Sequence, residues 1–284
     1  DTGVNQYHPD LNSNIWMNPA DPIDGKDNDG NGYADDFAGW DFIMGDSMPT
    51  DDDSHGTHVA GLAASGVSGV APQARIMSIK ALSALGTGDT ASITAAIMYA
   101  SDRGAHIINA SFGAESSGLM TALKKSMDYA ESKGVLFIAA AGNGDRQTGL
   151  GVDNDVRPHY PSSQPNNNVL SVAATNLQGT LSSFSNYGKV SVDLAAPGGD
   201  RSDGPLNATF YVHSKKSYVG MAGTSMATPV VAGAAAVLKS YAPQLTALQI
   251  KDLLMSSSKK VPALKGKLVS DGWLDVQAAL EAAR

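Results

Sequence analysis

The 284-residue chain contains no cysteine, which excludes disulfide bonds and thiolate metal sites. No apolar stretch reaches the roughly 18 to 20 residues that span a bilayer. The N-terminus lacks a basic-then-apolar segment, as expected once a signal peptide has been removed. The chain also has no clustered Lys/Arg stripe that could displace counterions from nucleic acid. These absences argue against a membrane-spanning protein and against a nucleic-acid partner.

The charge is distributed unevenly along the sequence. The chain carries a net −8, yet residues 1–53 hold thirteen Asp and only one cation, Lys26, a formal −12 that leaves +4 for the remainder. A run of charge is often no more than a solvated face. Here the acids are all Asp and are interleaved with Gly and Asn, a composition that suits cation binding better.

The hydrophobic fraction of 42% is sufficient for a sizeable core in a single domain of this length. Short apolar runs alternate with amphipathic stretches, which predicts βαβ units and a doubly wound α/β fold, with a mostly parallel central sheet flanked by helices. The expected strands are Ile76–Leu82, His106–Ala110, Val135–Ala140, Val169–Ala173 and Val190–Leu194. Two expected helices end at Gly104 and at Gly134. Three more are expected over Ser225–Tyr241, Leu248–Leu254 and Val276–Ala283.

Three short motifs carry the chemistry. Residues 1–3 read DTG, residues 55–61 read HGTHVAG and residues 223–229 read GTSMATP. A serine hydroxyl becomes nucleophilic when a base removes its proton, and the base needs a third group to fix its tautomer. Alone, Ser225 could be a helix N-cap and His55 a loop histidine. Together the motifs favour Ser225 as nucleophile, His55 as general base and Asp1 as orienting acid, whereas His58 is expected to be structural.

At these residues the chain resembles the subtilisin-like serine proteases, or subtilases, from Asp1 almost to the C-terminus. The resemblance implies a single catalytic domain over residues 1–284 with a subtilisin-like fold. It also implies a secreted serine endopeptidase that cleaves polypeptide substrates through an acyl-enzyme. Family members are zymogens that fold with an inhibitory N-terminal prodomain, so we expect a prodomain partner, and we expect the mature protein to be a monomer.

The resemblance fails at one point. In subtilases the acidic triad residue follows a central apolar strand, but here Asp1 is the first residue. Without that strand, its neighbours would have unpaired backbone donors and acceptors in the core. We therefore expect either a segment upstream of Asp1 that lies outside this sequence or an autolytic nick before Asp1.

The resemblance also implies roles for residues after the strands. Asn143 follows the apolar run 135–140 and matches the asparagine that donates a hydrogen bond to the oxyanion in subtilases, although Asn-Gly alone would indicate a turn. Extended peptides bind by pairing with free strand edges. The residues expected at these edges and in the wall of the first specificity pocket are Gly86, Gly88, Ser111, Gly113, Ala141 and Gly142, with Asp153 and Asp155 on the opposite wall favouring a basic substrate residue.

The segment 24–36 is expected to bind Ca²⁺. Hard oxygen ligands at alternate positions follow the logic of an EF-hand loop, although Ala38 replaces the glutamate at position twelve. The expected ligands are Asp27, Asp29, Asn31, the Tyr33 carbonyl and Asp36; a solvated acidic turn is the alternative. Asp10 matches a ligand of the strong calcium site of bacterial subtilisins, but segment 62–69 is too short to complete that site, so we expect it to be missing. Asp51, Asp52 and Asp53 have two possible roles, as a second cation site or as the source of a local negative field, and the sequence does not choose between them.

Two other functions are compatible with the sequence. A truncated or catalytically silent subtilase scaffold would bind peptides without turnover, and the absent strand before Asp1 favours it. A peptide ligase or cyclase of the same fold would use the same nucleophile, but the sequence shows no obvious lid to exclude water.

Overall fold

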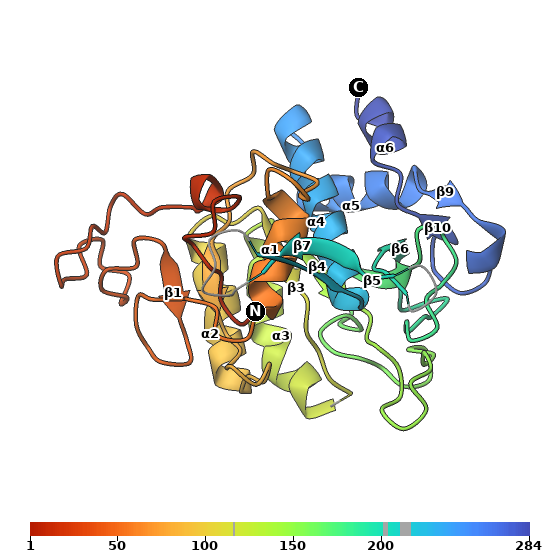
Figure 1. The fold of residues 1–284 in the computed structure, drawn as a ribbon, viewed down its shortest axis with the longest axis horizontal. Helices are drawn as coiled ribbons and strands as arrows, with labels where there is room; N and C mark the ends of the chain where they lie inside the picture. Colours follow the sequence, from red (N-terminus) through yellow and green to blue (C-terminus); the bar gives the residue numbers. More distant parts are fainter. Residues whose placement is uncertain (116, 201–203, 211–216) are drawn as a thin grey trace.

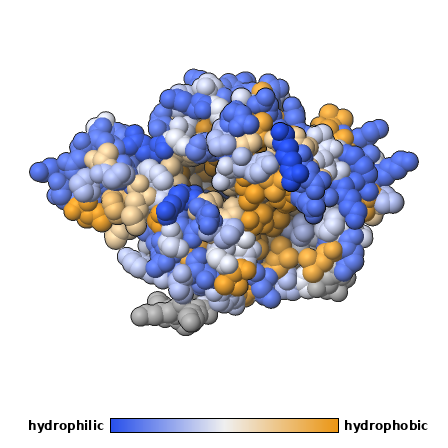
Figure 2. Space-filling model, turned by 90° about the horizontal axis from the view of Figure 1, so that it is seen from above, coloured by the Kyte–Doolittle hydropathy of each residue, from blue (hydrophilic) through white to orange (hydrophobic). Residues whose placement is uncertain are grey.

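The computed structural model describes residues 1–115, 117–200, 204–210 and 217–284. In Figure 1 the N-terminal segment with strand β1 (Gly39–Asp41) forms one end of the molecule, and helix α6 (Val276–Ala282) lies toward the other end. The end that carries the N-terminal segment is mostly hydrophilic in Figure 2, in keeping with its excess of Asp. No helix in the described ranges is both long and apolar enough to cross a membrane.

The larger sheet has the mostly parallel topology that the sequence predicts. In spatial order, its first five strands are parallel to one another, and the sixth, a short edge strand, is antiparallel to the fifth. In spatial order, the described residues form β3 (Ile107–Ala110), β4 (Leu136–Ala140), β5 (Val169–Thr175), β6 (Leu194–Pro197), β10 (Gly272–Trp273) and β9 (Lys259–Lys260).

Helices cover both faces of this sheet. The helices of the described residues are α1 (His55–Ala64), α2 (Thr90–Asp102), α3 (Ser117–Ser132), α4 (Thr224–Tyr241), α5 (Ala247–Ser256) and α6, with 3₁₀ turns at Asn12–Asn14 and Pro262–Leu264; α1 packs against α4 and β7 (Leu206–Thr209). Alternate residues of β4 point to opposite faces. Leu136 and Ile138 pack with side chains of α4, α5 and α6, whereas Phe137 and Ala139 pack with those of α2 and α3. Burial on both faces explains why this strand is a continuous apolar run.

Two short pairs of strands lie outside the larger sheet. Strand β1 pairs in parallel with β2 (Ser78–Lys80), and β7 (Leu206–Thr209) pairs antiparallel with β8 (Tyr218–Met221). The sequence did not predict β1, β7, β8, β9 or β10, because strands of two to four residues are too short to show a period. The predicted strand Ile76–Leu82 was too long, since only its centre, β2, forms a strand, while Ile76 pairs with Ile15 in an isolated bridge.

The expected strand Val190–Leu194 was wrong in position. The strand begins at Leu194, and Val190 is 81% exposed. The physical reason is a competing partner for the backbone. The Asp155 carboxylate accepts hydrogen bonds from the N–H groups of Val190 and Ser191, so this stretch forms a loop before it enters the sheet.

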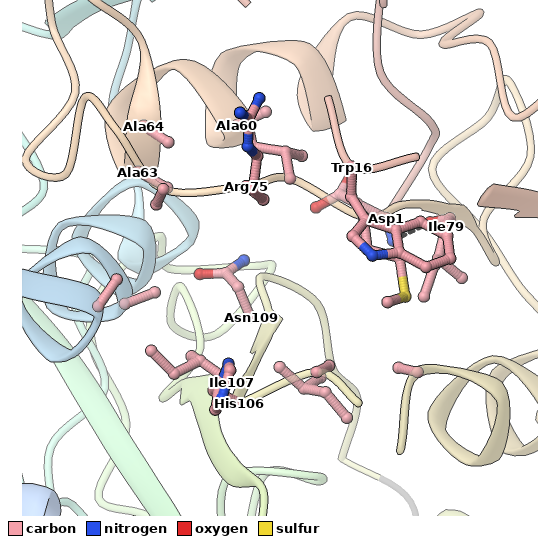
Figure 3. Close-up of a pocket in the computed structure, with 18 of the residues that line it drawn as sticks. Asp1, Trp16, Ala60, Ala63, Ala64, Arg75, Ile79, His106, Ile107 and Asn109 are labelled. Carbon is pink, nitrogen blue, oxygen red and sulfur yellow. Dashed lines mark hydrogen bonds between the residues drawn. The ribbon is translucent and has the colours of Figure 1, made fainter. Parts of the chain in front are cut away.

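An apolar pocket of about 690 Å³ separates the two parallel sheets. Figure 3 shows Ile79 of β2 and Asp1 on one side of it and Ile107 and Asn109 of β3 on the other. Small side chains of α1, including Ala60 and Ala63, form its upper wall in this view. Strands β2 and β3 therefore each border the pocket at the edge of a sheet.

Candidate active site

The predicted nucleophile and base begin two neighbouring helices. His55 is the first residue of α1, and Ser225 lies in the first turn of α4. Val59 and Met226 pack in one cluster near the helix starts. One turn later in α1 and two turns later in α4, a methyl group on Gly233 would lie 2.8 Å from the Ala63 carbonyl. The two helices therefore run in the same direction, and both N-termini face the site, where a helix dipole stabilises negative charge.

Asp1 and His55 form the first contact of the site. Asp1 Oδ1 lies 2.8 Å from His55 Nδ1 and also accepts the Thr2 N–H at 2.7 Å. The Asp1 carbonyl accepts the N–H groups of Ala81 and Leu82, which fixes the residue beside the end of β2. Because a carboxylate accepts from Nδ1–H, this contact selects the tautomer whose Nε2 is free to take a proton. Burial lowers the pKa of His55, which favours the neutral base.

Ser225 is half-buried and exchanges hydrogen bonds with Ser111, the residue after β3. Its hydroxyl donates to the Ser111 carbonyl at 2.9 Å, and the Ser111 hydroxyl donates to the Ser225 carbonyl at 2.9 Å. A hydroxyl has one hydrogen, so Ser225 does not donate to His55 in this rotamer. Rotation about its Cα–Cβ bond would redirect the hydroxyl.

Asn143 extends from the carboxyl end of β4 toward the start of α4. Its Oδ1 accepts hydrogen bonds from the N–H of Thr224 at 2.8 Å and from the Thr224 hydroxyl at 2.9 Å. These bonds orient the amide so that Nδ2 faces Gly223, where an added methyl group would lie 3.4 Å away. The first-turn N–H of Ser225 has no acceptor within the helix. Asn143 Nδ2 and the Ser225 N–H thus supply hydrogen-bond donors beside the Ser225 hydroxyl.

Comparisons with known proteins identify the family to which this chain is similar. The family model described as "Subtilase family" matches residues 1–273. Thermitase from Thermoactinomyces vulgaris is 35% identical over 246 residues, covering 84% of this chain and 73% of thermitase. Subtilisin-like protease 1 from Plasmodium vivax is 34% identical over 306 residues, and the match spans 100% of this chain but only 46% of that protein. The crystal structure of a cold adapted subtilisin-like serine proteinase superposes with a TM-score of 0.76 at 28% identity, covering 96% of this chain and 85% of that one.

The chain belongs to the subtilase family. By that membership it is a subtilisin-like serine endopeptidase with the α/β fold of the family.

Asp51 holds this subtilase site together, although the sequence left it unassigned. The carboxylate is fully buried. One oxygen accepts from the Thr2 hydroxyl and the Ser54 N–H, and the other accepts from the N–H and hydroxyl of Thr57, at 2.5 to 2.9 Å. It therefore ties the loop that carries Asp1 to the start of the helix that carries His55. Asp51 lies just before the N-terminus of α1, a position where a carboxylate can accept the free N–H groups of the first turn.

Asp52 is also part of the site's support. It forms an ion pair of 2.5 Å with the buried Lys80, whose ammonium also donates to the carbonyls of Thr2 and Leu82. The buried Asp51 therefore acts as a hydrogen-bond acceptor within the fold, and Asp52 as the partner of Lys80. His58 is structural, as predicted, since its Nε2 contacts the carbonyls of Leu206 and Val219 in the β7–β8 pair.

The expected substrate-binding residues fall into two groups. Gly86 adopts a left-handed φ of 66° in a turn closed between Ser83 and Thr87, and Gly88 packs against the Ala81 carbonyl. The second group surrounds the start of α4. Ser111 contacts Ser225, and Gly142 donates its N–H to the Thr224 hydroxyl at 3.2 Å.

The other residues of the second group have different partners. The Ala141 carbonyl accepts from the side chains of Asn154 and Asn186, and Gly113 packs against His159. The Asp155 carboxylate accepts backbone N–H groups at 190–191, and the Asp153 carboxylate accepts the Asp155 N–H, so the basic preference stays a prediction.

The acidic loop is organised by its own hydrogen bonds. Asp27 accepts backbone N–H groups of Gly30, Asn31 and Gly32, and Asp29 forms a 2.5 Å ion pair with Arg103. The buried Asp36 accepts from the Tyr99 hydroxyl and from the amides of Asn18 and Asn31. Tyr33 packs edge-on against Trp40, Phe42 and Tyr99. Within the described residues, no group of three acidic, His or Cys side chains is placed to hold a metal.

Asp10 also has a partner within the chain. Its carboxylate accepts the Tyr218 hydroxyl at 2.5 Å.

Catalysis should depend on pH through His55. Burial lowers the pKa of His55 below its ordinary value of 6.5, while the nearby Asp53 raises it. Protonated His55 cannot accept a proton, so the second-order rate of reaction with a fluorophosphonate probe should fall only at pH values below 6.5. Asp53→Asn should move this acid limb to still lower pH. A limb above 6.5, or one that moves upward in the variant, would contradict the lowered pKa of His55.

Proposed function

We propose that the chain hydrolyses peptide bonds through Asp1, His55 and Ser225. The observation that carries the proposal is the 2.8 Å contact between Asp1 and His55 at the start of a helix that runs beside the helix of Ser225. The Ser225 hydroxyl turns from the Ser111 carbonyl toward His55 Nε2, which takes its proton. The Ser225 oxygen then attacks the substrate carbonyl carbon.

The charge that develops on the substrate oxygen is stabilised by the Asn143 side-chain N–H and the Ser225 backbone N–H. The imidazolium formed at His55 is stabilised by the Asp1 carboxylate. It gives its proton to the leaving amine, and the acyl group stays on Ser225. Water, deprotonated by the same histidine, releases the acid product and restores the serine.

Polypeptide substrates would bind in extended form. Gly86 and Gly88 on one side and Ser111 and Gly113 on the other supply the backbone for strand pairing, and Ala141 with Gly142 forms a wall for the side chain before the cleaved bond. Family resemblance adds that the protease is secreted and folds with an inhibitory prodomain, and a monomer is the default expectation.

We also propose that the acidic loop binds Ca²⁺. Its donors are chemically suitable, because they are carboxylate and amide oxygens. Asp29 Oδ2 and Asp36 Oδ1 converge on the Asn18 amide nitrogen, at 3.0 and 2.6 Å. The oxygen and nitrogen of an asparagine amide exchange places by a flip, so Asn18 and Asn31 would present oxygen to a cation lying between these carboxylates.

We further propose that one more β-strand fills the apolar pocket between β2 and β3. Asp1 donates its amino group to the Ile79 carbonyl at 3.3 Å and accepts from the Ala81 N–H at 2.9 Å. This is the pairing of a parallel strand opposite Lys80. A strand in the same register would pair with β2 on one side and β3 on the other, joining the two sheets. Its side chains would be apolar on both faces, like those of β4.

The central test is intact mass after reaction with a fluorophosphonate probe. One adduct at Ser225 is expected, and none in Ser225→Ala. Asn143→Ala should still be labelled at Ser225 but should lose about 10²–10³-fold in peptide turnover, a magnitude that comes from subtilisin and not from this geometry. Products of a test peptide should have the masses of hydrolysis. Absence of the adduct would indicate a silent scaffold, and joined or cyclic products would indicate a ligase.

Calcium should raise thermal stability. A ligand at a hundredfold excess over its Kd adds about 2.7 kcal/mol, which corresponds to a Tm increase of ~5–10 °C in a chain of this size. A chelator should remove the increase, and the double variant Asp27→Asn, Asp29→Asn should not respond to calcium. Asp46→Asn, in the same acidic segment but outside the loop, is the matched control. Equal Tm values with calcium and with chelator would refute the site.

Peptide addition tests the proposed strand. A soluble peptide with a core of about six Val, Ala and Ile residues should raise the Tm as its concentration increases, because it binds the folded chain. The control peptide has the same composition with proline in place of a central valine, which removes a ladder N–H. The proposal is wrong if neither peptide shifts the Tm, or if both shift it equally.

A further inference from the structure

Asn143 is followed directly by a glycine, the neighbour that leaves an asparagine side chain most open to attack by the next backbone nitrogen. Gly144 has no Cβ beside its nitrogen, and Asn143 is exposed to water. The two hydrogen bonds from Thr224 to Asn143 Oδ1, at 2.8 and 2.9 Å, draw electron density away from the amide carbon Cγ and make it more electrophilic. The residue proposed to bind the oxyanion therefore belongs to a dipeptide that can deamidate.

The fold requires a glycine at position 144. Gly144 has a left-handed φ of 82°, and a methyl group added to it would lie 2.3 Å from the Leu150 carbonyl oxygen and 3.0 Å from that of Phe184. Both neighbours are backbone atoms, which cannot turn away as a side chain would. The proposed chemistry uses the asparagine and the packing uses the glycine, so the site retains a dipeptide that is chemically labile.

The buried side chain of Asn186 restrains the attacking nitrogen. Its Oδ1 accepts the Gly144 N–H at 2.9 Å. Its Nδ2 donates to the Ala141 carbonyl at 3.1 Å and to Asn154 Oδ1 at 2.9 Å, and these partners fix the orientation of the amide. The Gly144 nitrogen must leave this hydrogen bond and lose its proton before it can reach Asn143 Cγ. Asn186 is thus placed to slow the reaction.

We propose that Asn143 is a deamidation site, that Asn186 slows its deamidation, and that the product has lost protease activity. The loss of activity rests on the proposed function, whereas the reaction itself does not. The Gly144 nitrogen gives its proton to hydroxide and bonds to Asn143 Cγ. The Cγ–Nδ2 bond breaks, and Nδ2 leaves as ammonia after taking a proton from water.

The first product is a cyclic imide formed by the two residues. Water opens the ring at either carbonyl, which gives aspartate or isoaspartate at position 143. In both products a carboxylate replaces the amide, so the hydrogen-bond donor is lost and a negative charge lies where the substrate oxygen becomes negative. The enzyme would therefore be inactivated by a reaction of its own backbone, without cleavage of the chain.

The first experiment follows deamidation by peptide mass mapping during incubation at alkaline pH, in Ser225→Ala chains that cannot digest themselves. Asn31, which also precedes a glycine, is the internal reference. In Asn186→Ala, conversion at Asn143 relative to Asn31 should rise by about two- to tenfold, the factor by which one ordinary hydrogen bond disfavours its broken state. Asn154→Ala is the matched control. It removes a neighbouring bond but leaves Gly144 bound to Asn186, so the ratio should not change.

The second experiment measures peptide turnover by the active chain. Turnover per intact chain should fall in step with the conversion of Asn143 during incubation. Asn143→Asp reproduces one of the two products. It should still be labelled by a fluorophosphonate at Ser225 but should lose about 10²–10³-fold in turnover, the scale known for one oxyanion donor in subtilisin.

The outcomes separate this inference from the proposed function. No labelling of the fresh wild type would defeat the proposed function and with it the loss of activity. Equal conversion ratios in Asn186→Ala and its parent, or wild-type turnover in Asn143→Asp, would overturn the inference. Should Asn186→Ala not fold, conversion at Asn143 is compared between the folded and the urea-unfolded Ser225→Ala chain. It should be faster in urea, and equal rates would overturn the restraint.

Discussion

Helix α4 constrains the rest of the structure because it runs through the core with its first turn at the active site. Small residues make this possible. Ala227, Ala234 and Ala235 are fully buried, and a methyl group on Gly233 would lie 2.8 Å from the backbone of α1. Protein interiors are close-packed, so a larger residue there would force α1 away from α4. The relative position of His55 and Ser225 follows from this packing.

Two buried charged side chains, those of Asp51 and Lys80, fix the position of Asp1. Asp51 and Lys80 are both almost completely buried, and each bonds to the loop that begins with Asp1. Such groups are tolerated in a core only when their hydrogen bonds are made. Because their partners belong to segments far apart in sequence, the network links the acid, the base and β2. The orientation of Asp1 thus depends on residues that never touch substrate.

The site also shows a division between reaction and recognition. The groups proposed for proton transfer and oxyanion binding start from helix N-termini or strand ends, where the backbone is rigid. The residues proposed to bind substrate come from loops held by side chains such as Asn186 and Arg157. Loops tolerate change better than strands do, so substrate choice can vary while the reacting groups keep their geometry.

The sequence predicted the features that local pattern encodes. The buried strand β4 appeared as an unbroken apolar run, the glycines at 104 and 134 marked helix ends, and the motifs around Asp1, His55 and Ser225 indicated acyl transfer. Strands such as β1 and β9 were missed because two or three residues hold no period. The strand at Val190 was misplaced because Asp155, 35 residues earlier, captures its backbone.

Tertiary structure alone decided the partners of polar groups. Nothing local to Asp51 distinguishes a cation ligand from a buried acceptor, since the difference lies in Thr2 and Thr57, which the fold brings to it. The same holds for His159, whose place between Gly113 and Gly142 depends on the pairing of Tyr160 with Ala114. Periodicity and motif chemistry are properties of neighbouring residues and can be read from the chain. Burial and hydrogen-bond partners are properties of the packed molecule, because they depend on which distant segments fill the space around each side chain.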